Sequence, residues 1–500
     1  MGRASGVLMH ISSLPNQFGI GSFGKSAYDF IDFLVETKQS YWQILPLTTT
    51  GYGDSPYQSF SAFAGNTHFI DFDLLAEAGY LNKEDYANID FGSQDDKVDY
   101  GKIYEARRPI LEKAVDNFMS KAVDLVYWDF TMTNQRWLEP FCEFMAIKEY
   151  FNHAPWYEWD EDIKLRKPKA IAQYTEKLSE KINYHFVTQF FFQQQWAKLK
   201  KYANERHIQI IGDLPIYVSL DSVEMWYTPE LFKTDKNKMP TFVAATPPDA
   251  FSEDGQYWGN PIYDWDKMKE DNFEWWIWRF KESLKRYDVI RLDHFRGFES
   301  FWEVEYGSKT AADGHWTKGP DYEFFKVIEN NVNKLNIIAE DLGVITEDVR
   351  KMHKSTGYPG MNVLQFAFDQ TDNPYLPHNY VYNSVAYVGT HDNETVTGWY
   401  NSSISDKTRK QIDEYLVRGK DESPAMMMNR GIASSHSKLA IYSMQDLLEL
   451  DNDARMNHPS TMGDNWKWRM IENQITEKIK NNLVTLTDRY FRSNPNVIAK

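Results

Sequence analysis

Eight short apolar segments recur along the chain, and stretches with helical periodicity separate them. They are centred near residues 8, 44, 210, 290, 337, 364, 387 and 441. An apolar run bounded by polar or turn-forming residues is typical of a strand buried on both faces of a parallel sheet. Strands that alternate with helices form βαβ units, and eight of them favour a closed barrel. We therefore predict an α/β fold, a (β/α)8 TIM barrel with insertions between its strands.

Two long stretches interrupt this alternation. Residues 76–200 are rich in charged and aromatic residues with helical periodicity and contain no convincing buried strand, so we predict a large helical insertion subdomain. Residues 221–265 form a second, smaller insertion. Because α/β barrels routinely exceed the usual domain length, we expect residues 1–500 to form a single catalytic barrel that carries both insertions.

The stretch Asp288 to Phe298, DVIRLDHFRGF, places four charged or titratable residues directly after an apolar run. They are Arg291, Asp293, His294 and Arg296. Strand ends are the usual place for chemistry in such barrels. The two arginines should keep Asp293 ionised at neutral pH, because nearby positive charge favours the anion. An ionised carboxylate there can act as a nucleophile, a base or a metal ligand. An ion-pair network that only closes the barrel rim explains this segment equally well.

Acidic residues also follow other predicted strands. They are Asp213, Glu340 with Asp341, and Asp392. Since the C-terminal strand ends of a barrel surround one mouth, these carboxylates should crowd around Asp293, and crowding should leave one ionised while another holds its proton. That arrangement suits glycosidic chemistry, in which one carboxylate attacks and another acts as acid and then as base. It could also bind a divalent metal, but the neighbouring Arg291, His294 and His391 disfavour a cation.

Composition restricts the partners and the compartment. The formal net charge is −17 and the sequence pI about 5.2, which opposes binding to nucleic acid or anionic membranes and leaves a neutral substrate unaffected. Cys142 is the one cysteine, which excludes an internal disulfide and a cysteine zinc site and fits a reducing compartment. The N-terminal apolar run is too short for a signal peptide, and no run reaches transmembrane length. We expect a cytoplasmic protein, a monomer or weak homo-oligomer, with no cofactor and no metal.

Ten sequence blocks, spread over nearly the whole chain, resemble those of one enzyme family. They are GVLMHISSLP, GIGSFG, WQILPL, GDSPYQSFSAFAGN, GDLPIYV, PPDAFSEDGQYWGNP, RLDHFRGF, AEDLG, GTHDNET and NWKWR. Each block alone is a weak signal, but ten in family order are very specific. The chain is similar to the 4-α-glucanotransferases of the amylomaltase or disproportionating-enzyme type, which belong to the α-amylase clan.

The resemblance implies a role for each matching residue. Asp293 would be the nucleophile that forms a covalent glucosyl-enzyme, Glu340 the general acid/base, and Asp392 the third carboxylate, which binds sugar hydroxyls and stabilises the transition state. The residues expected to bind substrate are Tyr57, Asp213, Asp249, Gln256, Trp258, Asn260, Arg291, His294, Phe366, His391 and Asn465. The insertion 221–265 is then expected to be a lid over the acceptor subsites. Ala250 departs from some relatives, which carry an aromatic residue there, and this bears on the shape of the lid.

The resemblance therefore implies a retaining 4-α-glucanotransferase. Such an enzyme moves a segment of a 1,4-α-D-glucan to the 4-hydroxyl of glucose or of another glucan, with maltooligosaccharides, starch and glycogen as the substrate class. An α-glucan hydrolase of the same clan is the nearest alternative. A catalytically silent glucan-binding protein is another, although the intact Asp293, Glu340 and Asp392 argue against it. A metal-dependent barrel hydrolase is the third.

Overall fold

A parallel barrel forms the centre of the molecule. The computed structural model describes residues 2–51, 53–121, 125–248, 253–368, 372–461 and 463–497. The barrel strands are β1 (Ala4–Leu8), β2 (Tyr41–Gln43), β3 (Gln209–Leu214), β6 (Val289–Leu292), β9 (Ile337–Ala339), β10 (Gly360–Val363), β11 (Ser384–Tyr387) and β12 (Leu439–Ser443). They pair in the order β10-β11-β12-β1-β2-β3-β6-β9, and every pair is parallel. The (β/α)8 barrel predicted from the apolar segments is confirmed.

The barrel closes between β9 and β10 with little regular pairing. The amide of Ala339 donates to the carbonyl of Pro359 at 2.9 Å, one residue before β10 begins. The Asp341 carboxylate accepts from the amide of Met361 at 2.7 Å. A backbone bond and a side-chain bond therefore link the two ends of the sheet at this seam.

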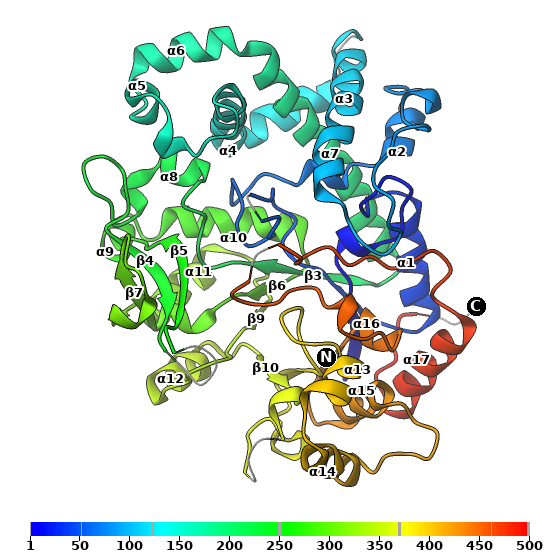
Figure 1. Cartoon of the computed structure of the whole chain (residues 1–500). Coiled ribbons are helices and arrows are strands. Elements are labelled where there is room, and N and C mark those ends of the chain that lie inside the picture. Colours follow the sequence, from blue (N-terminus) through cyan, green and yellow to red (C-terminus); the bar gives the residue numbers. More distant parts are fainter. Residues whose placement is uncertain are drawn as a thin grey trace.

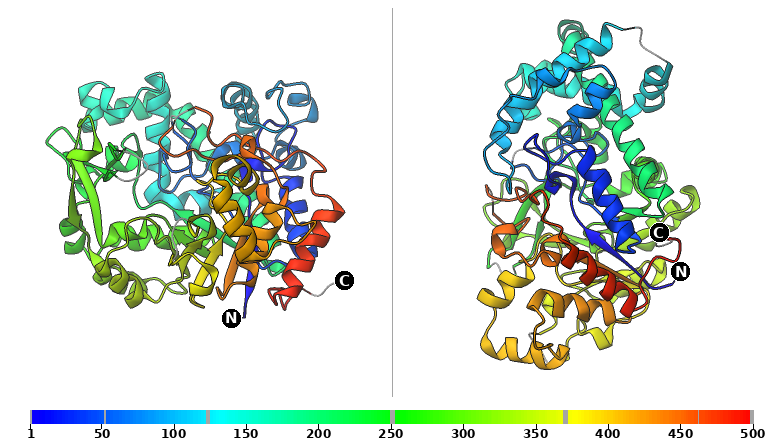
Figure 2. Two further views of the ribbon diagram at one scale, coloured as in Figure 1. Left: turned by 60° about the horizontal axis from the view of Figure 1, so that its bottom comes forward. Right: turned by 90° about the vertical axis from the view of Figure 1, so that its right-hand side faces the viewer.

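Helices surround the barrel. The longer ones are α1 (Lys25–Glu36), α10 (Glu274–Arg286), α11 (Asp321–Asn331), α12 (Glu347–Thr356), α14 (Asp406–Leu416), α15 (Pro424–Ser434) and α17 (Glu477–Arg489). The shorter ones are α8 (Val223–Tyr227), α9 (Trp265–Glu270), α13 (Val396–Gly398) and α16 (Met444–Leu447). In α10, Trp276, Phe280 and Ser283 recur at helical spacing and are buried, as expected for an amphipathic helix on a core. α17 lies beside α1 (Figure 2), where Lys480 pairs with Glu36 at 2.8 Å.

The helices that lie between β2 and β3 in the sequence form a layer over one side of the barrel (Figure 1, cyan). It consists of α2 (Phe72–Glu77), α3 (Tyr100–Met119), α4 (Leu125–Tyr150), α5 (Glu161–Lys164), α6 (Pro168–Lys177) and α7 (Ser179–Glu205). No helix in the described ranges is both long enough and apolar enough to cross a membrane.

A second, antiparallel sheet stands beside the barrel (Figure 1, green, left). Its strands are β4 (Phe242–Thr246), β5 (Gln256–Pro261), β7 (Ser300–Glu305) and β8 (His315–Lys318), in the order β5-β4-β7-β8. β4 and β5 precede β6 in the chain, whereas β7 and β8 follow it. The sequence did not predict these strands, because they are short and only partly buried: in β8, for example, only Thr317 is not exposed.

Candidate active site

The ends of three neighbouring barrel strands bring carboxylates together. Asp213 lies in β3, and Asp293 and Glu340 directly follow β6 and β9. Leu292 and Ala339 are register partners, so Asp293 and Glu340 occupy equivalent positions on adjacent strands, and such strands lie about 4.8 Å apart. The amide of Glu340 donates to the Leu292 carbonyl at 3.1 Å. These acidic residues, far apart in the sequence, therefore meet at one mouth.

Arg291 is the buried cation that joins two of these carboxylates. Its Nη1 lies 2.9 Å and 2.7 Å from the two oxygens of Asp213, and 2.9 Å from Oδ1 of Asp293. The hydroxyl of Tyr57 donates to the same Asp213 at 2.9 Å. The result is a connected chain from Tyr57 through Asp213 and Arg291 to Asp293, which holds the Asp293 carboxylate in one orientation.

The protonation of Asp293 and Glu340 follows from their surroundings. Burial raises the pKa of Asp293 to about 7, against the opposing effect of Arg291. Burial also raises the pKa of Glu340 to about 8, and the charge of Asp293 adds to this rise. Because Arg291 bonds directly to Asp293, Asp293 loses its proton first. Near neutral pH the pair holds one proton, and that proton is on Glu340.

Arg296 does not flank Asp293, and the prediction of two flanking arginines is wrong for this one. Its guanidinium donates to the carbonyl of Val344 at 2.7 Å and to the hydroxyl of Ser300 at 2.8 Å. It also lies over the ring of Trp316, 3.9 Å from its centroid. The physical reason is local geometry, because the chain turns into a short helix after His294 and carries Arg296 toward the second sheet.

His294 connects the end of β6 to Glu340. Its backbone is left-handed, with φ of 48°, which is uncommon outside glycine. In this conformation its amide donates to Oε2 of Glu340 at 2.7 Å. The imidazole approaches Gly297 so closely that an added Cβ there would lie 2.8 Å from the ring. Burial and the charge of Arg296 lower the pKa of His294 to about 3, so the ring is neutral.

Asp392 reaches the barrel mouth from the loop after β11. Oδ1 accepts from Nδ2 of Asn457 at 2.7 Å and lies 3.4 Å from Nε2 of His391. The Tyr57 ring stacks on His391 at a centroid distance of 5.2 Å, and Trp466 contacts both rings. Burial lowers the pKa of His391, so the aromatic wall that Tyr57, His391 and Trp466 form is uncharged. Sugar rings bind well to such a surface, because aromatic faces pack against their C–H groups.

The predicted lid residues on β5 differ in what they contact. Trp258 lies edge-on to the His294 ring at 4.9 Å, and its indole N–H donates to Gln256 at 3.3 Å. Both therefore adjoin the mouth. Asn260 is buried and bonds to the Val218 carbonyl at 2.8 Å and to Gln58 at 3.3 Å, so its amide supports the protein itself. Asp249 and Ala250 lie outside the described residues.

Phe366 and Asn465 lie outside the hydrogen-bonded cluster that the described residues form. Phe366 follows β10, is 40% exposed and packs edge-on to Tyr375 at 5.6 Å. Asn465 accepts from the amide of His458 at 2.8 Å and donates to the Thr461 carbonyl at 3.0 Å, so it braces its own loop. The remaining predicted residues are gathered at the mouth: Tyr57, Asp213, Gln256, Trp258, Arg291, Asp293, His294, Glu340, His391 and Asp392.

Sequence reasoning missed Arg455, Asn457 and the contacts of Trp466. Arg455 donates to the Asp392 carbonyl at 2.7 Å, and Asn457 bonds to its side chain. Neither follows a barrel strand, so the strand-end pattern gave no signal for them. Trp466 lies in the block NWKWR, and that block is the sequence signal by which its place near the site could have been found.

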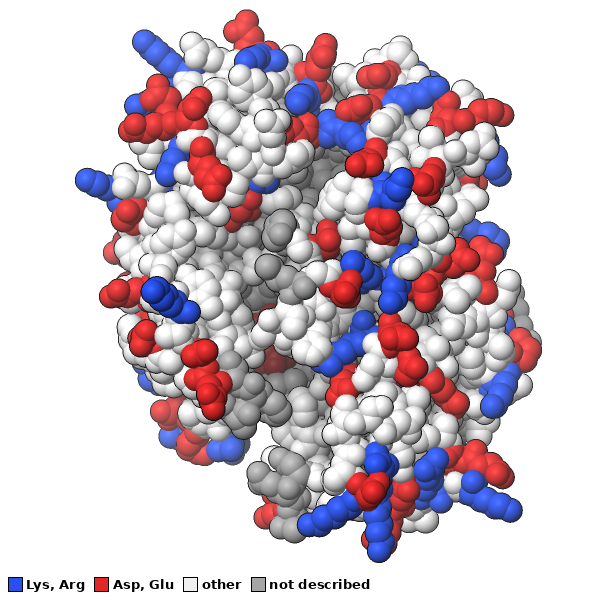
Figure 3. All heavy atoms as spheres, in the orientation of Figure 1, with Lys and Arg blue, Asp and Glu red and all other residues white. Residues whose placement is uncertain are grey.

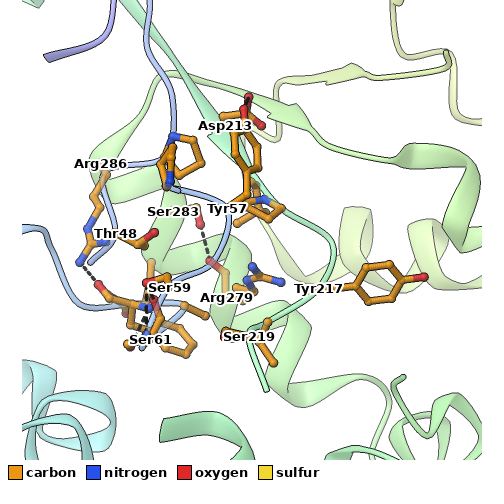
Figure 4. A pocket seen from close by; sticks show the side chains of 18 of the residues that line it. Thr48, Tyr57, Ser59, Ser61, Asp213, Tyr217, Ser219, Arg279, Ser283 and Arg286 are labelled. Atoms are coloured by element: carbon orange, nitrogen blue, oxygen red, sulfur yellow. Dashed lines mark hydrogen bonds between the residues drawn. The ribbon is translucent and has the colours of Figure 1, made fainter. Parts of the chain in front are cut away.

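A cavity of about 30 Å³ lies behind Tyr57 and Asp213. Figure 4 shows both side chains at its wall, which Arg279, Ser283 and Arg286 also line. Its volume accommodates roughly one water molecule and not a sugar ring. Figure 3 shows a hollow near the centre of the face turned to the viewer, with charges of both signs spread over the surrounding surface.

Comparisons with known proteins agree on one family. Residues 9–474 match the profile described as 4-alpha-glucanotransferase. A 4-alpha-glucanotransferase of Streptococcus pneumoniae serotype 4 (strain ATCC BAA-334 / TIGR4) is 56% identical over 498 residues, 99% of each chain. That of Clostridium butyricum is 49% identical, over 97% of this chain and 100% of its own. The amylomaltase from Streptococcus agalactiae in complex with acarbose is 50% identical with a TM-score of 0.97, over 98% of this chain and 100% of that one.

Proposed function

Because the chain belongs to the 4-alpha-glucanotransferase family, we propose that Asp293, Glu340 and Asp392 carry out its transfer reaction. The protein is a 4-α-glucanotransferase that acts on α-1,4-glucans. The observation that supports this assignment of roles is the pair formed by Asp293 and Glu340. One member bonds to Arg291 and ionises first, and the other keeps a proton at neutral pH.

In the first step, Glu340 gives its proton to the glycosidic oxygen while the Asp293 carboxylate attacks the anomeric carbon. The bond between that carbon and the oxygen breaks, and the reducing-end part of the donor leaves with a free 4-hydroxyl. The remaining segment is bound to Asp293 as an ester of inverted configuration. Adjacent strand ends, about 4.8 Å apart, suit the separation of roughly 5–5.5 Å that retention requires.

In the second step, Glu340 removes the proton from the 4-hydroxyl of an acceptor. That oxygen attacks the anomeric carbon, and the Asp293 carboxylate departs. The second inversion restores the α configuration, so one α-1,4 bond replaces another. Glu340 is protonated again and the site is ready for the next donor. Hydrogen bonds from the His294 and Leu342 amides hold the Glu340 carboxylate throughout, at 2.7 Å and 3.2 Å.

Asp392 supports both steps by binding sugar hydroxyls and stabilising the positive charge that develops on the ring. Tyr57 and His391 supply the apolar wall beneath the same ring, and Asp213 and Arg291 fix the nucleophile. We assign Gln256, Trp258 and His294 to substrate binding as well, because they adjoin the mouth. For Asp249, Asn260, Phe366 and Asn465, the assignment to substrate binding rests on the family resemblance alone.

Transfer requires that a sugar outcompete water at the intermediate. Water is smaller and more concentrated, so the acceptor must be oriented by binding energy and the site must exclude water. We assign this task to residues 221–265 as a lid subdomain, with Trp258 stacked on the acceptor ring. Residues 76–200 form the helical subdomain on the same barrel.

We propose maltooligosaccharides and longer glucans of the starch and glycogen type as substrates, with glucose as the smallest acceptor. The acarbose complex of the Streptococcus agalactiae amylomaltase supports an oligosaccharide site. A cytoplasmic location is supported by the lone, buried Cys142, which fits a reducing compartment. The acidic surface is compatible with a monomer or a weak homo-oligomer.

The experiment that tests this function is incubation with maltotriose. Transfer releases glucose and longer oligosaccharides while the number of reducing ends stays constant, whereas hydrolysis raises that number. The Asp293→Asn variant is the control and should release no glucose. A rise in reducing ends equal to the glucose released would assign the site to hydrolysis instead.

A further inference from the structure

Asp392 receives a hydrogen bond from a residue to which no role has been assigned. Nδ2 of Asn457 lies 2.7 Å from Oδ1 of Asp392. Asn457 follows the short helix Asn452–Ala454 and lies 65 positions beyond Asp392 in the chain. An amide that donates to a carboxylate makes a charge-assisted bond, which is roughly twice as strong as a neutral one.

The segment that carries Asn457 is itself fixed to the Asp392 loop. We call residues 455–457 the bracing segment. Nη2 of Arg455 donates to the Asp392 carbonyl at 2.7 Å, and Nε of Arg455 donates to the Asn457 carbonyl at 2.8 Å. The amide of Asn457 donates to the carbonyl of His391 at 3.1 Å. The bracing segment therefore holds both the backbone and the side chain of the third carboxylate.

The contact divides the two oxygens of Asp392 between different tasks. Oδ1 is occupied by Asn457, with Nε2 of His391 at 3.4 Å. Among the described residues, Oδ2 receives no hydrogen bond from the protein. The side chain is 45% exposed, so without Asn457 it could rotate into solvent. With Asn457 in place, Oδ2 is left to accept from the hydroxyls of a bound sugar.

We propose that Asn457 is a positioning residue of the transfer reaction. It sets the rotation of the Asp392 carboxylate by donating a hydrogen bond to one of its two oxygens. This inference rests on the role proposed above for Asp392. The asparagine side chain suits this task because it donates a proton to the carboxylate and cannot itself become an anion.

Two substitutions separate positioning from simple loop packing. Asn457→Ala removes the donor, and kcat for maltotriose should fall about tenfold to hundredfold, the effect of losing a hydrogen bond to a charged group, with a much smaller change in KM. Asn457→Asp is nearly isosteric but places a second carboxylate against Asp392. The two carboxylates repel each other and the donor is lost, so kcat should fall at least as far as in Asn457→Ala, again with a much smaller change in KM.

The charge control is Asn481→Asp on the exposed face of α17, which should keep the wild-type kcat. Melting temperatures identify any loss of folded enzyme, and Asp392→Asn serves as the reference for loss of the third carboxylate. The inference is overturned if both Asn457 variants keep the wild-type kcat while Asp392→Asn is inactive. If Asp392→Asn retains full activity, the proposed role of Asp392 fails, and the inference fails with it.

Discussion

Replacing Glu340 by Gln should make activity depend on the ionisation of Asp293 alone. In the proposed mechanism, the native enzyme depends on the ionisation states of both Asp293 and Glu340. In that mechanism, the active form of the enzyme has Asp293 ionised and Glu340 protonated. Gln has the same shape as the protonated acid, and its carbonyl can still accept from the amide of His294. The variant therefore keeps the geometry of the site and loses only the proton that Glu340 transfers.

The pH dependence of the native enzyme follows from the two pKa values, about 7 for Asp293 and about 8 for Glu340. The active form is therefore most populated between these two values and declines on either side, which gives a bell-shaped profile. In Glu340→Gln, turnover of maltotriose should fall about 10²- to 10⁴-fold, the usual worth of a positioned acid.

A donor whose leaving group needs no proton restores the first step. With α-maltosyl fluoride, the variant requires only that Asp293 be ionised. The burst of fluoride, measured with a fluoride electrode, should rise through about pH 7 and stay level to about pH 9. The burst should stop near one equivalent, because no base remains to activate an acceptor. The matched control is Glu472→Gln at an exposed position, which should keep the bell-shaped pH profile of the native enzyme. A fluoride burst that declines above pH 8 in the variant would show that Glu340 does not carry the proton.

Three further outcomes are expected. Burial raises the pKa of Asp446 to about 7; because the native state then binds the proton more tightly than the unfolded chain, its contribution to stability is present below about pH 4 and is lost as the pH rises to about 7, at a cost of about 4 kcal/mol. Asp446→Asn should therefore raise the melting temperature at pH 8 and leave it unchanged at pH 4, and equal shifts at both would contradict this. Trp258→Ala should raise the KM for acceptors about tenfold, as expected for a lost aromatic contact, and increase the reducing ends released from maltotriose, while unaltered kinetics would remove Trp258 from the acceptor site. Exhaustive chelation with EDTA should leave the maltotriose rate unchanged, and a loss that added metal restores would revive a metal-dependent mechanism.

The barrel could be predicted because its strands are buried on both faces and are therefore continuously apolar. Where prediction and structure differ, the cause is local chemistry. The strand predicted near residue 44 spans only Tyr41–Gln43, and Pro46, which has no amide proton to donate, lies in the part that does not pair. The second sheet was missed because strands such as β8, HWTK, bury too little to show a pattern.

The candidate site was only partly predictable for a related reason. Asp213, Asp293 and Glu340 lie at strand ends, where the barrel topology alone brings them together. The bond from Asn457 to Asp392 joins two loops, and loop-to-loop contacts follow no periodic pattern in the sequence. The direction of Arg296 depends on the left-handed backbone of the preceding His294, a conformation that the residue type does not announce.

The second sheet takes two strands from before β6 and two from after it. β6, the strand that Asp293 directly follows, is thus connected at both ends to one small sheet. Residues 221–265 consequently cannot be exchanged between relatives as an independent unit, because their removal would leave β7 without its partner β4. Chimeras between relatives will need to exchange residues 221–318 as one piece, which includes β6.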